Sequence, residues 1–106
     1  MIYKFKSKAA GDVVMTGPGG DELLRSIGKA PAPKGIIEAA DMPAAIAAIE
    51  RAVAAEEAAR ARADQEAAAE GRKPGPRDIS LRQRAWPMVE MMKRSQAEDA
   101  DIVWGV

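Results

Sequence analysis

The segment from Ser80 to Val106 constrains the fold more than any other stretch of this sequence. Ser80 and Gln83 form a capping box, in which two side chains bind backbone amides that the first helical turn leaves without partners. At about 100° per residue, the apolar side chains that follow fall on one helical face. That face comprises Leu81, Ala85, Met88, Val89 and Met92. We therefore predict an amphipathic helix from Ser80 to about Gln96, with its apolar face buried.

Pro87 lies inside this predicted helix and removes one of its hydrogen bonds. An interior proline costs about 3 kcal/mol, because its ring also presses on the carbonyl four residues back. On the helical wheel Pro87 lies on the polar side, where the freed carbonyl of Gln83 can bind water. This placement favours one kinked helix over two separate helices.

Strands are predicted at both ends of the sequence. Tyr3–Ser7 alternates apolar and polar side chains, and Asp12–Thr16 is a second run of strand-forming residues, which together indicate a hairpin. We expect Tyr3 and Phe5 to face the helices, and Lys4 and Lys6 to face water. Ile102–Val106 is predicted to form a final strand, and the hairpin offers a free edge with which this strand can pair.

Two further helices are predicted between the hairpin and the final helix. Asp21 caps a short helix that ends at Gly28, and Asp41 caps a longer one with Pro43 in its first turn. The glycines before Asp21 suggest a phosphate-binding loop, but the third glycine of that motif and the Lys-Ser/Thr pair are missing. We interpret them as a plain turn. Gly35–Glu38 fits either a short strand or an apolar segment that is buried under the next loop.

The longer helix extends beyond the residues that can be buried in the core. Its apolar stripe ends near Ala55, and residues 56–70 hold no apolar side chain larger than alanine. Helix propensity and spaced ion pairs, such as Glu56 with Arg60, can still keep this segment helical. We predict a single domain over residues 1–106, in which residues 56–77 form a protruding alanine-rich helix end and a flexible turn.

Composition excludes several classes of function. The 106 residues include no cysteine and no histidine, so thiolate chemistry and the commonest general base and zinc ligand are absent. The formal net charge is zero, which argues against a general nucleic-acid binder. No apolar run reaches the length of a membrane span, and the first residues do not form a signal peptide. We therefore expect a cytoplasmic protein that does not contact the membrane.

The best candidate binding site is the basic flank of the final helix. Residues 72–94 carry seven Lys or Arg and two acids. Within this stretch, Arg82, Arg84, Trp86 and Lys93 could together stack a base or ring and hold a phosphate. The competing interpretation is structural, because a tryptophan at the shoulder of an apolar face usually covers the core edge beneath neighbouring Arg and Lys stems.

The sequence predicts no catalytic residue, no metal site and no cofactor. Glu98, Asp99 and Asp101 lack the glycine and the ligand spacing of a calcium loop. The remaining carboxylates and lysines form no recognisable combination of acid, base and nucleophile. Met91 lies outside the core stripe of the final helix and is a further candidate contact.

Five segments of the sequence form a specific pattern that covers essentially the whole chain. They are Met1–Ala9, Lys34–Ile37, Met42–Ile46, Ser80–Pro87 and Ile102–Val106. Together they closely resemble a small proteobacterial family, the domain of unknown function numbered eighteen-forty. The resemblance implies a stand-alone, cytoplasmic bacterial protein, and it supplies no activity, cofactor or catalytic residue.

These observations predict an α+β fold, with an antiparallel sheet of the N-terminal hairpin plus the C-terminal strand and with helices packed on one face. The leading functional hypothesis is a non-enzymatic interaction module that binds an unknown protein partner or a second copy of the chain. The alternative is RNA or anion binding through the basic flank of the final helix. A third hypothesis is an enzyme with an unrecognised carboxylate site.

Overall fold

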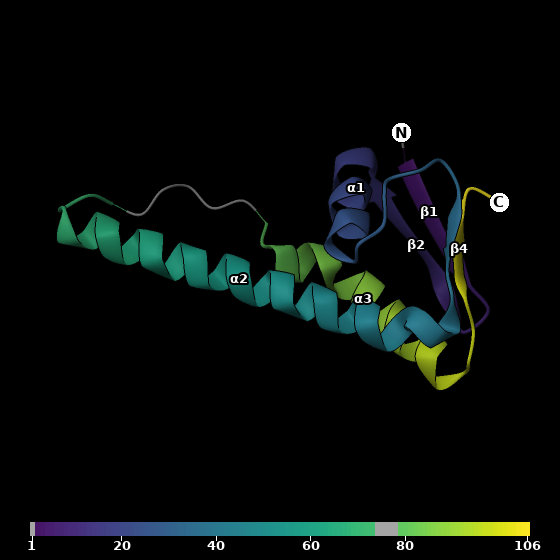
Figure 1. Ribbon diagram of the computed structural model, residues 1–106. Coiled ribbons are helices and arrows are strands. Elements are labelled where there is room, and N and C mark those ends of the chain that lie inside the picture. Colours follow the sequence, from purple (N-terminus) through teal and green to yellow (C-terminus); the bar gives the residue numbers. More distant parts are fainter. Residues whose placement is uncertain (1, 74–78) are drawn as a thin grey trace.

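The computed structural model describes residues 2–73 and 79–106 of the chain (Figure 1). Its strands are β1 (Ile2–Ser7), β2 (Ala10–Thr16), β3 (Gly35–Ile37) and β4 (Ile102–Trp104), and its helices are α1 (Gly17–Ser26), the short 3-10 helix η1 (Ala39–Asp41), α2 (Met42–Ala69) and α3 (Leu81–Ala97). The α+β fold is confirmed. Most of the predicted flexible turn, residues 74–77, lies outside the described residues.

The four strands form one antiparallel sheet in the order β2-β1-β4-β3. β1 and β2 form the predicted hairpin, and β4 pairs with β1 as expected. Gly35–Ile37, whose sequence left two interpretations open, is a strand that pairs with the other side of β4. The C-terminal strand therefore lies inside the sheet and joins the hairpin to β3.

The core lies between the sheet and the three α-helices, which Figure 1 shows on one side of the sheet. Tyr3 and Phe5 are 2% and 0% exposed, as predicted. The Phe5 ring stacks on Tyr3 at 5.7 Å between centroids and meets Trp104 edge-on at 5.6 Å. The Trp104 indole also donates a hydrogen bond to the Ala32 carbonyl at 3.0 Å, which fixes the connector before β3.

Helix α1 begins at Gly17, so the prediction that Asp21 caps it is wrong. Thr16 is the residue before the helix, and Pro18 lies in the first turn, where its fixed φ angle suits a helix. Gly20 is buried against the Tyr3 ring, and a Cβ atom there would overlap that ring. The glycines before Asp21 therefore belong to the helix. Because Gly20 has no side chain, α1 can pack closely against the Tyr3 ring of β1. Gly28, with φ of 84°, follows the end of α1 as predicted.

The Asp21 carboxylate binds the sheet instead of the helix terminus, since it accepts a hydrogen bond from the Tyr3 hydroxyl. This hydrogen bond and the burial of the ring raise the pKa of Tyr3 above its usual 10.0. The folded protein thus holds the phenol proton more tightly than the unfolded chain does. The resulting stabilisation is complete below the unfolded pKa and is lost as the pH rises through the folded pKa.

We expect the free energy of unfolding to fall as the pH rises above about 10. Tyr3→Phe should make this slope shallower, because it removes the phenol and leaves the ring stack. Denaturant unfolding over a pH series measures both slopes, and tyrosinate absorbance follows Tyr3 directly, since it is the only tyrosine. Equal slopes in the two proteins would contradict this account.

Helix α2 starts where the sequence predicts, with Asp41 as the residue before it and Pro43 in its first turn. The Asp41 side chain, however, makes no capping hydrogen bond, and the 3-10 helix η1 precedes α2. The Asp101 carboxylate accepts a hydrogen bond at 2.8 Å from the amide of Ala39, the first residue of η1 and 62 positions away in the sequence. The acidic turn before β4 therefore satisfies a backbone donor at the beginning of the helical segment.

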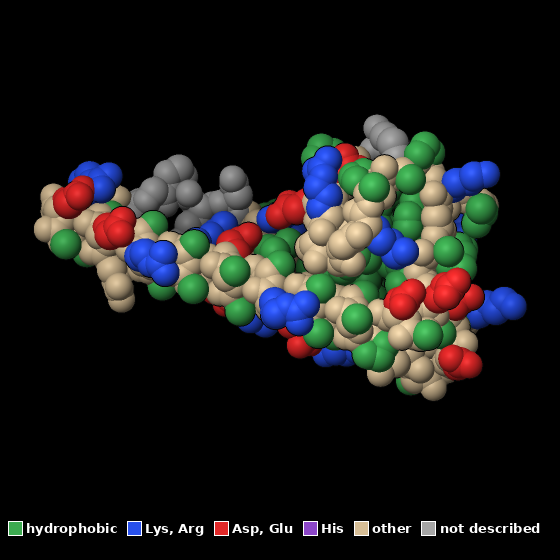
Figure 2. Space-filling model, in the orientation of Figure 1, with side chains coloured by type: hydrophobic (Ala, Val, Ile, Leu, Met, Phe, Trp, Pro, Cys, Tyr) green, Lys and Arg blue, Asp and Glu red, His purple; other side chains and the backbone are tan. Residues whose placement is uncertain are grey.

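Helix α2 extends well beyond the rest of the molecule (Figure 1), whose principal extents are 51 × 28 × 22 Å. Glu56 forms the expected ion pair with Arg60 at 3.7 Å. Figure 2 shows acidic and basic side chains along the extended part. Among the helices that the structure describes, none combines the length and the apolar character that a membrane span requires.

Helix α3 follows the sequence prediction closely. The capping box of Ser80 and Gln83 is present, and the helix continues without a break through the exposed Pro87. Met91 is only 2% exposed, so its assignment as a candidate contact is wrong. It is buried because the sheet, α2 and η1 together cover a wider arc of α3 than the predicted stripe.

Candidate functional site

A groove with a volume of ≈ 320 Å³ runs between α2 and α3. Its floor consists of core side chains from both helices, namely Ile49, Val53, Ala85 and Val89. Its rim is polar and aromatic, with Glu50 contributed by α2 and Arg82, Trp86 and Lys93 contributed by α3. Three of the four predicted site residues therefore meet in one groove. They do so because positions 82, 86, 89 and 93 share one flank of a helix.

Trp86 is the most unusual residue of this groove. Its side chain is 55% exposed, whereas Trp104, the other tryptophan, is 3% exposed in the core. A large aromatic side chain loses favourable burial when it stays in water, and tryptophan is enriched at protein interfaces for that reason. Trp86 thus leaves about half of its surface in water at the rim of the groove.

Arg82 is held at the groove rim by an acid from the neighbouring helix. Its Nε and Nη2 atoms both contact Oε1 of Glu57, at 3.0 and 2.5 Å. This side-chain pair is more than 40% exposed on both partners, so it contributes only up to about 1 kcal/mol to stability. Its main effect is to neutralise part of the positive charge that the sequence assigned to this flank.

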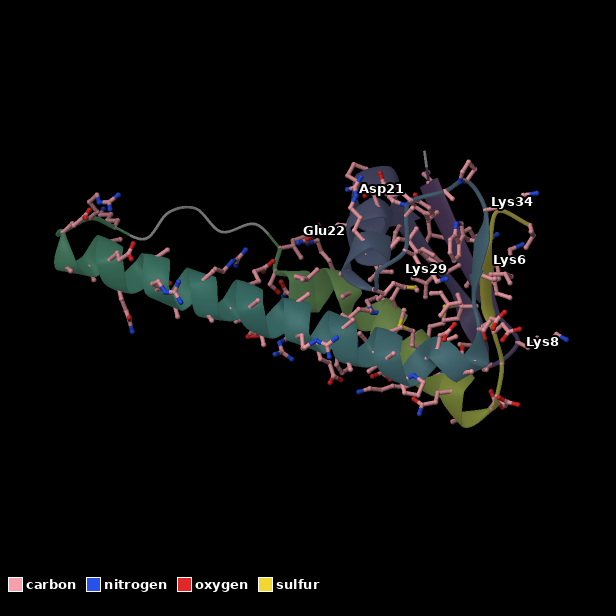
Figure 3. All side chains as sticks on the ribbon, viewed as in Figure 1. Lys6, Lys8, Asp21, Glu22, Lys29 and Lys34 are labelled. Carbon is pink, nitrogen blue, oxygen red and sulfur yellow. The ribbon has the colours of Figure 1, made fainter. Side chains whose placement is uncertain are left out.

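Arg84 lies outside the groove, and its contacts are structural. Its Nη1 atom binds Glu22 of α1 at 2.6 Å, its Nη2 atom lies 3.7 Å from Glu56 of α2, and its Nε donates to the Ile79 carbonyl at 3.2 Å. Figure 3 labels Glu22 on α1. Arg84 thus links three helices. Two positions beyond Arg82, it points to the other side of α3.

The sequence interpretation missed the acidic partners of these arginines. Glu56 and Glu57 stand where the apolar stripe of α2 becomes charged, and the Glu56 carboxylate also accepts a hydrogen bond from the Leu81 amide at 3.0 Å. That change from apolar to acidic side chains was the feature of the sequence from which these contacts could have been predicted. It indicates that α2 stays in contact with the start of α3 through its carboxylates after its apolar side chains end.

The structure is thus that of a small α+β protein with a groove in its helical layer. Among the described residues, no group of acidic side chains could hold a metal ion. Residues 1–104 match the family model described as Domain of unknown function (DUF1840). The chain belongs to this family, and the predicted resemblance is confirmed. Neither the comparison with curated proteins nor that with solved structures gave a match.

Proposed function

We propose that this protein is a non-enzymatic interaction module, which binds an amphipathic helix of a partner protein in the groove between α2 and α3. The observation that carries the proposal is the exposure of Trp86, 55%, at the rim of a groove with an apolar floor. Buried tryptophans dominate the binding energy of many protein interfaces, and a partner that covers Trp86 gains that burial.

A helix suits this groove because two packed helices already form its walls. A third helix laid along them would place apolar side chains at i, i+3 or i+4, and i+7 against Val53, Val89 and Trp86. Glu50 on one rim and Lys93 on the other lie where the polar flanks of such a helix would run. Charges of both signs at the rim favour a mixed polar flank over a purely anionic ligand.

The contacts of the arginines weaken the competing hypothesis of RNA or anion binding. Arg82 is paired with Glu57, and Arg84 is paired with Glu22 and Glu56. An anion would have to displace or lie beside these carboxylates, which repel it. Lys93 is the remaining cation of the predicted site, and one lysine beside a tryptophan gives a weak phosphate site.

Selection of helical peptides from a random display library against the immobilised full chain tests this proposal. We expect the enriched peptides to share an apolar stripe and to bind in calorimetry. Trp86→Ala should weaken their binding at least about tenfold, as loss of a central aromatic contact does. Arg94→Ala, an exposed change on another side of α3, is the matched control and should leave binding unchanged.

Enriched peptides that bind the Trp86→Ala variant as tightly as the unaltered protein would overturn the proposal. A selection that yields no common apolar spacing would count against a helical partner. A single-stranded RNA titration run in parallel separates the competing hypothesis. Tight, salt-dependent RNA binding lost in Trp86→Ala would replace the proposed partner with a nucleic acid.

A further inference from the structure

The sheet ends on one side at β2, whose outer edge has no partner strand among the described residues. The strand order β2-β1-β4-β3 makes β2 and β3 the two edge strands. β3 comprises only three residues, whereas β2 comprises seven. The backbone amides and carbonyls on the outer side of an edge strand are unpaired and can bind a further strand. β2 therefore offers the longer template for strand addition.

The sequence of β2 contains little that would block such an addition. Edge strands are commonly protected by lysine, by proline or by a bulge. β2 contains no lysine and no proline, and Asp12 is its single charged residue. Its pairing with β1 shifts register between Phe5 and Ser7, near the hairpin turn. Residues 13–16 pair with β1 without interruption, so this half of the edge is regular.

The side chains of β2 that face the helices are less well covered than those of β1. Tyr3 and Phe5, which lie opposite Met15 and Val13 in the hairpin, are almost completely buried. Met15 and Val13 pack against the same core but remain partly exposed. On the outer face of the sheet, opposite the helices, Val14 is 61% exposed. The edge strand thus presents apolar side chains on both faces of the sheet.

A small apolar pocket borders the same strand on the helical side of the sheet. It has a volume of ≈ 180 Å³, and its apolar lining includes Met15 of β2, Leu23 of α1, and Leu81 and Ala85 of α3. An apolar side chain placed beside Met15 by an added strand would lie at this pocket. It would bury apolar surface there, which favours association.

We propose that β2 pairs with β2 of a second copy of the chain, antiparallel and centred on Val14. Val14 would then lie opposite Val14 of the second copy, and Val13 opposite Met15. Residues directly opposite each other share one face of a sheet, so the first pair lies on the outer face and the second on the helical face, beside the pocket. Asp12 would lie opposite Thr16, so no like charges meet. The result is one continuous sheet with the α-helices of both copies on the same side.

Symmetry and strand length favour this contact over the alternatives. A pairing of β2 with β3 of the next copy would join only three residues and would repeat head to tail into an open filament, whereas a symmetric pair closes after two copies. A strand from another protein would need apolar side chains at the same positions, which a second copy supplies by its own sequence. Because the paired segment is short, we expect a weak dimer that forms as the protein concentration rises.

Sedimentation equilibrium of the full chain over a concentration series tests this proposal. We expect the mass to rise from that of one chain towards that of two. Val14→Lys and Val14→Glu should each remain monomeric, because two like charges would then face each other. An equimolar mixture of these two variants should recover the dimer, since a lysine would face a glutamate. Ile36→Lys, an exposed position on the other edge strand, is the matched control and should dimerise like the unaltered protein.

A monomer at every concentration would overturn the proposal, as would a dimer that Val14→Lys leaves intact. Loss of the dimer in both variants without recovery in their mixture would overturn the register centred on Val14. Amide hydrogen exchange of the unaltered protein needs no variant to fold. Exchange at residues 13–16 should slow as the dimer forms, and unchanged exchange would contradict edge pairing. An extended peptide of alternating valine and threonine is titrated alongside, and its binding to a chain that stays monomeric would assign the edge to a partner strand instead.

Discussion

Replacing Phe5 with alanine is expected to lower the free energy of unfolding by about 3–5 kcal/mol, the usual cost of removing a buried aromatic ring. Phe5 is fully buried on a central strand, where it stacks on Tyr3 and meets Trp104 edge-on. Its removal would leave a cavity between both neighbouring rings. Because a domain of this size is stabilised by only about 5–15 kcal/mol, this loss is a large part of its total stability.

Urea unfolding, followed by circular dichroism, measures this loss. Val14→Ala is the matched control on the neighbouring strand, because its side chain is 61% exposed on the outer face. It should cost less than about 1 kcal/mol, as most surface substitutions do. Equal losses in the two variants would show that the ring cluster of Tyr3, Phe5 and Trp104 is not the centre of the core.

Gly20→Ala should destabilise the protein by about 1–3 kcal/mol, although alanine is normally the better helix former. Gly20 lies in the middle of α1, where a Cβ atom would overlap the Tyr3 ring. Tyr3 has little room to withdraw, since it is buried, stacked on Phe5 and hydrogen-bonded to Asp21. The substitution must therefore push α1 away from the sheet.

Gly11→Ala provides the control for the intrinsic effect of the substitution. Gly11 lies in β2, and a Cβ atom there has no neighbour within 4 Å. We expect a change of less than about 1 kcal/mol, towards higher stability, because alanine restricts the unfolded chain. Thermal unfolding measures the change in stability of both variants. A stabilised Gly20→Ala variant would mean that Tyr3 and α1 are packed more loosely than their contacts indicate.

Local sequence patterns predicted those elements whose causes are local. The capping box at Ser80, the alternation around Tyr3 and Phe5, and the placement of Pro87 on a polar flank each depend on residues within one element, and each is confirmed. The prediction failed at Asp21, which resembles a helix cap, because α1 begins earlier and the distant Tyr3 hydroxyl binds the Asp21 carboxylate. Asp41 precedes α2 as predicted but makes no side-chain capping hydrogen bond.

Only the part of the candidate site that lies on α3 could be predicted from the sequence. The spacing of Arg82, Trp86 and Lys93 on α3 placed them on one flank, and the groove contains all three. The acids that pair with the arginines come from α1 and α2, and no spacing within α3 reveals them. The place of β3 in the sheet likewise depends on which strands become neighbours, because Ile36 and its partner Val103 are far apart in the sequence.

The position of β4 inside the sheet has a consequence for how the protein is made. β3 pairs with β4 and, within the described residues, with no other strand, so it must wait for β4 to be synthesised. β4 follows every other element in the chain. Until β4 has been synthesised, Tyr3, Phe5 and Ile37 therefore lack part of their cover, and an incomplete chain exposes apolar side chains that favour aggregation.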